Sequence, residues 1–379
     1  MRILLLGEYS RLHNTLKEAL LSLGHDVMLV STGDYFKKFP SDIDVSSGLL
    51  RTKFTKKTGV AFYKLFKLDI FKKDVYFNLK KYIDSFKNFD VVQLINEDAF
   101  GIYPEDEIKI LNKIFARNKK SFVLACGEDT HVIDYYNSRK VRYSILNAYF
   151  ENSGLDKHFA FSFKYLKPEY QELHRFVLEH VDGIIPSDLD YAIPYRGIDK
   201  VLPLIPNPVN VDRFEFEPLV INGKINIFHG INELSYYKKG SHIIIDVLNQ
   251  IEKKYSNRVN ITTVRNMPYN QYVQLYNQAH IFIDQLYSFD QGFNALEAMA
   301  RGKCVLTGAE KEFETFYNLN REVAVNASPD KDKLYQTLEE LILHPDRIVD
   351  VGKNARKFVE EKHHYKEVAK LYINAWQSV

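Results

Sequence analysis

Short apolar runs alternate with helix-length stretches through the first 205 residues of the chain. Such runs are typical of strands that are buried on both faces of a parallel sheet. Between the first two runs, leucines recur at helical spacing until Gly24, a residue that commonly ends a helix. The predicted strands are residues 3–6, 26–30, 91–95, 121–125 and 183–186, and the predicted helices include 105–117 and 168–180. This alternation predicts a doubly wound α/β sheet.

A proline-rich segment separates this series from a second one. Pro203, Pro206 and Pro208 lie within six residues, and such a segment continues neither a helix nor a central strand. The second series has predicted strands at 225–228, 259–264, 281–284 and 304–307, and predicted helices at 241–254, 270–278 and 294–301. We therefore expect two Rossmann-like domains that face a cleft. The expected divisions are an N-terminal α/β domain (1–205), a linker (206–222), a C-terminal α/β domain (223–360) and a C-terminal helix (361–379) that packs back on the first domain.

Composition excludes several classes of protein. Two isolated cysteines among 379 residues, Cys126 and Cys304, fit neither a zinc site nor a disulfide framework. The apolar start is too short for a signal peptide, and no apolar run reaches the roughly 18 residues that span a bilayer. We expect a cytoplasmic protein. With 51 basic and 49 acidic residues the net charge is +2, which argues against a nucleic-acid partner.

The small net charge conceals a basic, aromatic-rich segment at residues 51–87. This segment has eleven basic and three acidic residues, so it carries +8 and the remainder of the chain carries 2 − 8 = −6. Nine aromatic residues are interspersed with the lysines. One interpretation is a surface that contacts anionic lipid or a lipid-linked acceptor, on the inner face of a membrane. The other is a pair of amphipathic helices whose aromatic rings pack inward.

Several catalytic motifs are absent from the sequence. Gly7-Glu8-Tyr9-Ser10 follows the first predicted strand where a dinucleotide-binding protein has G-x-G-x-x-G. The chain also has no P-loop, no G-x-S-x-G and no H-E-x-x-H. Aspartates at D-x-D spacing occur at 42/44 and 188/190, but caps and turns explain such pairs more often than a metal does. We expect no metal site.

The most informative segment is residues 279–308. A predicted strand ends at Asp284, a polar loop with a glycine follows, and a helix begins near Asn294. The first backbone N–H groups of that helix would point into the loop, where they can bind an anion such as a diphosphate. Glu297, one turn into the helix, can accept hydrogen bonds from vicinal sugar hydroxyls. Alternatively, Glu297 only complements the helix dipole.

The stretch Leu296-Glu-Ala-Met-Ala-Arg-Gly-Lys-Cys-Val305 resembles the donor-site helix of retaining GT-B glycosyltransferases of the large group 1 family. Residues 205–214 resemble the family's linker, and Lys239-Gly240 resembles the Lys-Gly that opens the second domain's first helix. The family motif has two glutamates with seven residues between them. The second, which contacts the ribose, falls on Glu297, and the first falls on Phe289. The family's Arg before Lys-Gly is also missing, and Lys238 precedes Lys239 instead.

The resemblance implies a set of site residues. Four are expected to be catalytic: Asp129, His131, Lys239 and Glu297. The donor-binding set shares a position near strand ends or the start of a helix, and comprises Gly7, Gly230, Lys238, Lys239, Gly240, Arg265, Met267, Asp284, Tyr287, Asp290, Gly292, Phe293, Asn294 and Glu297. No cofactor is implied. The donor substrate is expected to be a UDP-, GDP- or ADP-linked sugar.

The resulting hypothesis is transfer of a sugar, with retention, to a glycan, lipid-linked or other hydroxyl acceptor in the synthesis of cell-surface polysaccharide or glycolipid. In such a reaction positive charge develops on the sugar and negative charge on the leaving phosphate, so cations and helix N–H groups at the phosphate lower the barrier. Two alternatives remain open. One is a nucleotide-sugar epimerase of the same two-domain plan, and the other is a non-catalytic protein that binds a small molecule.

Overall fold

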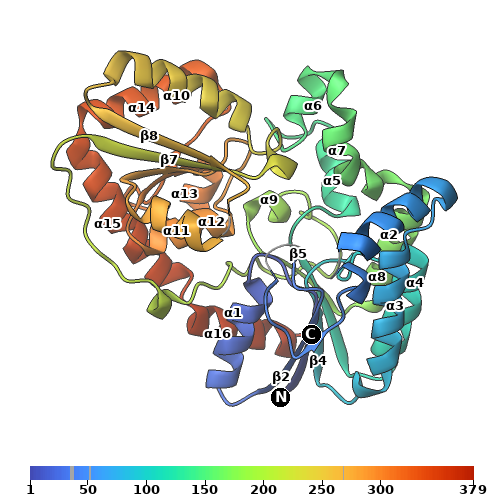
Figure 1. Cartoon of the computed structure of the whole chain (residues 1–379). Helices are drawn as coiled ribbons and strands as arrows, with labels where there is room; N and C mark the ends of the chain where they lie inside the picture. The colour runs from blue at the N-terminus through green and yellow to red at the C-terminus, as the bar shows by residue number, and fades with distance from the viewer. Residues whose placement is uncertain (35–37, 51–52, 268) are drawn as a thin grey trace.

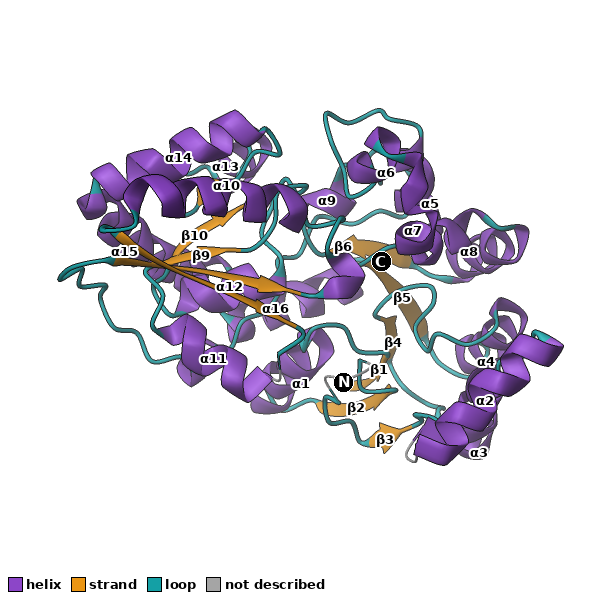
Figure 2. Ribbon diagram, turned by 45° about the horizontal axis from the view of Figure 1, so that its top comes forward, coloured by secondary structure: helices purple, strands orange, loops and turns teal. Residues whose placement is uncertain are grey.

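A computed structural model describes residues 1–34, 38–50, 53–267 and 269–379. Its N-terminal unit is built on a parallel sheet of order β3-β2-β1-β4-β5-β6 (Figures 1 and 2). The strands are β1 (Arg2–Leu6), β2 (Asp26–Ser31), β3 (Ile43–Asp44), β4 (Val91–Leu94), β5 (Lys120–Ala125) and β6 (Gly183–Pro186). The helices are α1 (Leu12–Ser22), α2 (Lys53–Phe66), α3 (Ile70–Tyr82), α4 (Pro104–Phe115), α5 (Thr130–Asn137), α6 (Asn147–Glu151), α7 (Asp156–Phe163), α8 (Pro168–His180) and α9 (Leu189–Ala192).

The C-terminal unit contains a second parallel sheet, of order β11-β10-β9-β7-β8. Its strands are β7 (Ile225–Ile231), β8 (Val259–Arg265), β9 (Ile281–Ile283), β10 (Cys304–Thr307) and β11 (Val325–Asn326). Its helices are α10 (Ser241–Tyr255), α11 (Tyr269–Asn277), α12 (Phe293–Ala300), α13 (Lys311–Tyr317), α14 (Lys331–Leu343) and α15 (Pro345–Lys362). Both predicted sheets are confirmed, with ends that differ from prediction by at most three residues. None of the described helices is long and apolar enough to cross a membrane.

The last helix, α16 (Tyr365–Gln377), returns to the N-terminal unit and packs on α1, as predicted (Figure 1). A buried chain of hydrogen bonds runs from it to the first strand end. Trp376 Nε1 donates to Gln93 Oε1 (3.0 Å), Gln93 Nε2 lies 3.1 Å from His13 Nε2, and His13 Nδ1 lies 2.8 Å from the Gly7 carbonyl. Burial lowers the pKa of His13 to about 4, so a neutral ring that donates from Nδ1 and accepts at Nε2 satisfies every partner.

Gly7 itself tolerates no side chain. Its φ is +83°, and a Cβ would lie 2.3 Å from Ile95 Cγ2 and 2.8 Å from the Ala99 carbonyl oxygen. Glycine accepts this left-handed conformation without steric cost, and the close approach leaves no room for any other residue. The loop after β1 is therefore fixed by backbone geometry and, through His13, by the C-terminal helix.

The two units meet through loops that follow β6 and β9. Asp190 accepts hydrogen bonds from the Phe289 amide (2.8 Å) and from the Ser288 hydroxyl, and Asp290 accepts from the Leu189 amide (3.3 Å). The ring of Phe289 stacks on Tyr143 at 5.2 Å, with an interplanar angle of 17°. Phe289, at the position of the first family glutamate, is therefore a contact between the units.

A cluster of three buried carboxyl groups lies in this contact. Burial raises the pKa of Asp290 to about 7 and that of Asp190 to about 6, and the Asp190 charge adds to the shift at Asp290. Burial, followed by the charges of Asp190 and Asp290, raises the pKa of Asp188 well above its ordinary value. Asp190 thus joins the units, whereas Asp188 caps α9. Among the described residues, no group of three or more His, Cys, Asp or Glu is placed to hold a metal ion.

Replacing Trp376 tests the packing of α16. Trp376→Ala removes a side chain that is 1% exposed together with its hydrogen bond to Gln93, and we expect the free energy of unfolding to fall by about 3–5 kcal/mol. Urea unfolding followed by fluorescence of tyrosine measures this change. Leu371→Ala, on the same helix but 45% exposed, is the control and should change stability by less than about 1 kcal/mol. Equal losses in the two variants would contradict the packing.

The carboxyl cluster predicts how stability depends on pH. The folded Asp290 keeps its proton up to a pKa of about 7, whereas an ordinary aspartate loses it near 3.8, so between these values the folded state holds a proton that the unfolded chain has released. The free energy of unfolding should therefore fall as pH rises through this window. Asp290→Asn should flatten the slope in urea unfolding between pH 5 and 8, and Asp199→Asn, at an exposed position, should not. An unchanged slope in Asp290→Asn would contradict the assignment.

Candidate donor site

The loop from β7 to α10 carries two consecutive lysines at the start of a helix. Gly240 is the N-cap of α10 with φ +73°, and a Cβ there would approach the Leu286 side chain to 2.9 Å. The Lys239 carbonyl accepts a hydrogen bond from the Leu286 amide (3.0 Å). Gly230, at the end of β7, faces the Tyr272 ring, where a Cβ would lie 2.3 Å from a ring carbon. The two glycines thus allow this loop to pack closely against its neighbours.

Lys239 pairs with Asp284, the residue directly after β9. Lys239 Nζ lies 2.7 Å from Asp284 Oδ1, and the two side chains are 27% and 4% exposed. Asp284 Oδ2 is buried and has no hydrogen-bond partner among the described residues. A Cβ on Gly292, the N-cap of α12, would lie 3.6 Å from this oxygen. The structure therefore brings the predicted residues Lys239, Asp284 and Gly292 together.

The first turn of α12 completes this group. Phe293 and Asn294 begin the helix, and its first backbone N–H groups have no acceptor within the helix. Glu297 lies in the following turn and is 7% exposed. Burial is the largest cause that raises the pKa of Tyr276, and the charge of Glu297 is the next. A helix start, a lysine and the Asp284 carboxylate thus meet at the carboxyl ends of β7 and β9, with Glu297 further along the same helix. This arrangement suits a ligand that carries both phosphate and hydroxyl groups.

Other predicted donor residues lie around this group with different partners. Arg265, at the end of β8, forms an exposed ion pair with Glu233. Met267 is half-buried against the core, and Tyr287 is buried. Asp290 faces the N-terminal unit, as described above. The neighbouring Pro268 lies outside the described residues.

Lys238 points across to the N-terminal unit, where it pairs with Glu128. Glu128 lies in the loop after β5, directly before the predicted catalytic residue Asp129, and the predicted His131 is in the first turn of α5. Glu128 is not among the predicted site residues. Its position directly after a parallel strand was the available signal, because ligands of open α/β sheets bind outside the carboxyl ends of the strands.

Asp129 and His131 are held inside the N-terminal unit. Asp129 is the N-cap of α5, where Oδ1 accepts from the Val132 amide (2.7 Å) and Oδ2 accepts from the Tyr195 hydroxyl (3.0 Å). Burial, with the charge of Glu97 next, raises the pKa of Asp129 to about 7. His131 Nε2 lies 2.9 Å from the Pro194 carbonyl, and burial lowers the pKa of its ring. Both side chains thus have structural partners within the N-terminal unit.

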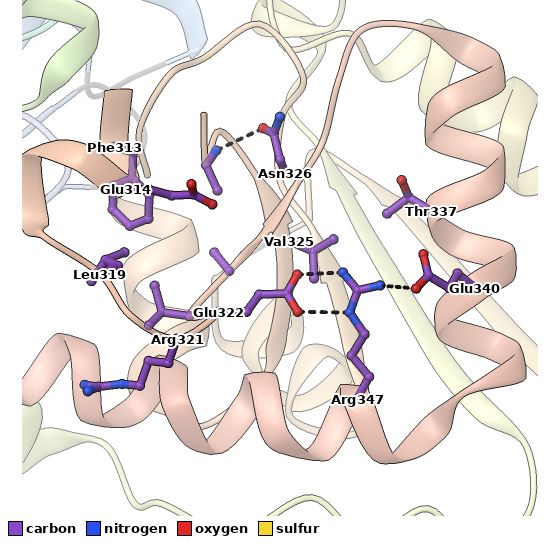
Figure 3. A pocket seen from close by; sticks show the side chains of 13 residues that line it. Phe313, Glu314, Leu319, Arg321, Glu322, Val325, Asn326, Thr337, Glu340 and Arg347 are labelled. Carbon is purple, nitrogen blue, oxygen red and sulfur yellow. Dashed lines mark hydrogen bonds and ion pairs between the residues drawn. The ribbon is translucent and has the colours of Figure 1, made fainter. Parts of the chain in front are cut away.

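A separate cavity of about 240 Å³ lies beside β11 (Figure 3). Arg347 forms ion pairs there with Glu322 (2.7 Å) and Glu340 (2.9 Å), as the dashed lines in Figure 3 mark. Arg321 also lines the cavity and pairs with Glu361 (2.7 Å). No predicted donor-site residue lines this cavity. The cavity is therefore separate from the lysine loop and from the start of α12.

Comparisons with known proteins show similarity in part of the sequence and in the fold. A family model described as glycosyl transferase-like matches residues 229–374. No curated protein sequence matches significantly. Sucrose-phosphate synthase from Thermosynechococcus elongatus is 15% identical, with a TM-score of 0.63 and 100% of both chains covered. Anabaena HepE, solved with UDP and glucose, is 12% identical with a TM-score of 0.58, again over 100% of both chains.

The UDP-GlcNAc 2-epimerase from Neisseria meningitidis, bound to UDP-GlcNAc, shares the architecture at 13% identity and a TM-score of 0.50 over 100% of both chains. At these identities the likeness concerns the fold. The two parallel sheets with their helices form a GT-B fold, which confirms the predicted fold class. The matched residues 229–374 include the lysine loop and α12, so the part of the chain that is similar to the glycosyl transferase-like family contains the candidate donor site.

Proposed function

We propose that the chain transfers a sugar from a nucleotide-sugar donor to a hydroxyl acceptor, with retention at the anomeric carbon. The observation that carries the proposal is the convergence of Lys239, Asp284 and the start of α12 at the carboxyl edge of the second sheet. Because related folds have been solved with UDP or UDP-linked sugars, UDP is the first nucleotide to test.

Each group in this site has a role in the proposed reaction. Lys239, Lys238 and the first N–H groups of α12 bind the diphosphate and stabilise the negative charge that it gains as it leaves. Glu297 accepts hydrogen bonds from the ribose hydroxyls, and Asp284 accepts one from the donor sugar. The departing phosphate takes the proton of the acceptor hydroxyl on the same face of the sugar, which gives retention. Asp129 and His131 support the cleft wall that faces the reacting sugar.

Acceptor binding is assigned to the N-terminal unit and to the exposed helix α2. Phe62, Tyr63, Leu65 and Phe66 on α2 are 37–75% exposed, and Phe77 of the neighbouring α3 is 60% exposed. Figure 1 shows α2 at the outer edge of this unit. Of the two interpretations of segment 51–87, this exposure supports the one with a membrane-facing surface, because inward-packed rings would be covered. Arg51 of this segment lies outside the described residues.

We place the protein in the cytoplasm, peripheral on the inner face of a membrane. There it would extend a lipid-linked or glycan acceptor in the synthesis of cell-surface polysaccharide or glycolipid. Lys57 and Lys64 on α2, and Lys67 directly after it, are exposed and would be attracted to anionic head groups.

Lys239→Ala tests the donor site. Removing one charge-assisted phosphate contact should weaken UDP binding by about 10- to 100-fold, since such a bond contributes about 1.5–3 kcal/mol. Isothermal titration calorimetry measures the affinity. Lys253→Ala, at an exposed position on α10, is the control and should leave it unchanged. If UDP, GDP and ADP each bind the variant with the same affinity as the native protein, the proposed site is wrong.

The reaction class is tested by incubating the native protein with UDP-linked sugars in the absence of an acceptor and following the sugar by NMR. A transferase should leave the configuration of the donor sugar intact. Accumulation of the 2-epimer would instead identify an epimerase, which shares this architecture.

Charge reversal on α2 tests the membrane surface. The triple variant Lys57→Glu, Lys64→Glu, Lys67→Glu should lose more than about tenfold in binding to phosphatidylserine vesicles, because each basic residue near the surface contributes about 1 kcal/mol. Sedimentation at low and high salt measures the bound fraction. Val220→Ser, at a 65% exposed apolar position outside this helix, is the control. No binding of the native protein at low salt would exclude this surface.

A further inference from the structure

The loop after β5 holds Glu128 in a fixed position at the edge of the N-terminal unit. Asn96 Nδ2 donates hydrogen bonds to the carbonyls of Cys126 (2.9 Å) and Glu128 (3.3 Å). Gly127 has φ +82°, and a Cβ there would lie 3.4 Å from the Tyr9 ring. The next residue, Asp129, caps α5. The backbone of Glu128 is thus fixed by residues of the N-terminal unit alone.

The side chain of Glu128 reaches the C-terminal unit. Glu128 Oε1 accepts a hydrogen bond from Lys238 Nζ, and the two side chains are only 17% and 11% exposed. Lys238 Nζ also lies 5.4 Å from the centre of the Phe161 ring on α7. Glu128 Oε2 is buried without a hydrogen-bond partner in the described part of the chain. Lys238 is therefore surrounded by groups from the opposite unit.

The charges of this arrangement cancel. Lys238 and Lys239 contribute +2, and Glu128 and Asp284 contribute −2. A carboxylate that is hydrogen-bonded to a half-buried cation competes with any second anion for that cation. Asp284 belongs to the same unit as Lys239 and moves with it. Glu128 belongs to the other unit, so a movement of the units can withdraw it from Lys238.

We propose that Glu128 is a latch that competes with the donor diphosphate for Lys238. Without a donor, Glu128 neutralises Lys238 and ties the two units together. When the donor enters, its diphosphate displaces the Glu128 carboxylate from Lys238 and takes over the lysine. The competition with the donor rests on the proposed function. The ion pair of Glu128 with Lys238 in the absence of a ligand does not.

Two measurements on Glu128→Gln test the latch. The first is the rate at which an N-hydroxysuccinimide ester acetylates Lys238 in the absence of any nucleotide, followed by peptide mass spectrometry. Loss of the carboxylate should raise this rate severalfold. The second is the affinity for UDP, which should rise about tenfold, equivalent to about 1.4 kcal/mol. Glu339→Gln, which breaks the ion pair with Lys254 on the outer side of the C-terminal unit, is the control and should change neither quantity.

A double variant separates competition from a general effect on the loop. In a Lys238→Ala background, Glu128→Gln should no longer change the affinity for UDP, because the lysine for which the two anions compete is gone. An unchanged acetylation rate of Lys238 in Glu128→Gln would overturn the latch. A faster rate with unchanged or weaker UDP binding would overturn the competition and leave the latch. If no nucleotide binds any variant while the acetylation rate rises, the proposed function fails and the latch stands.

Discussion

Parallel strand pairing is the constraint on which the rest of this structure depends. In each sheet the described strands run in one direction, so the loops that follow them open along a single edge. Residues far apart in the chain thereby come together: Lys239 follows β7, Asp284 follows β9, and α12 begins only after a further loop. The same pairing in the first sheet places Gly7 and Glu128 at its carboxyl edge. The position of the candidate site therefore depends on strand direction more than on any single side chain.

Contact between the two units determines which of these polar groups are available to a ligand. Asp290 and Phe289 lie in the loop that would border the donor, yet both are committed to the N-terminal unit through Leu189 and Tyr143. Burial keeps the carboxyl group of Asp290 protonated up to a pKa of about 7, which removes a charge that would otherwise repel the neighbouring Asp190. The carboxylate that remains beside Lys239 is Asp284.

The sequence predicted the elements better than it predicted their contacts. Continuous apolar runs marked all the long strands, because both faces of a parallel strand are buried. It did not reveal β3 and β11, which have two residues each and are held by their neighbours' hydrogen bonds. The short helices α5, α6 and α7 were also missed, since such segments carry too few residues for a periodic pattern.

The limits of prediction are similar at the site. Local motifs placed Lys239, Gly240 and Glu297 at helix starts. Nothing local indicated that Lys238 would pair with Glu128, 110 positions away, or that Phe289 would stack on Tyr143. These contacts depend on how two separately folded sheets face each other. The linker and the return of α16 determine that arrangement, and no short segment of the sequence predicts it.

Hydrogen–deuterium exchange with and without UDP tests the central claim most directly, because it reports where the nucleotide binds along the whole chain. The account predicts slower exchange in peptides that cover residues 230–241 and 284–297, at the carboxyl edge of the second sheet. Protection confined to residues 319–347, around the separate cavity, would contradict it, as would no protection under conditions in which UDP binds.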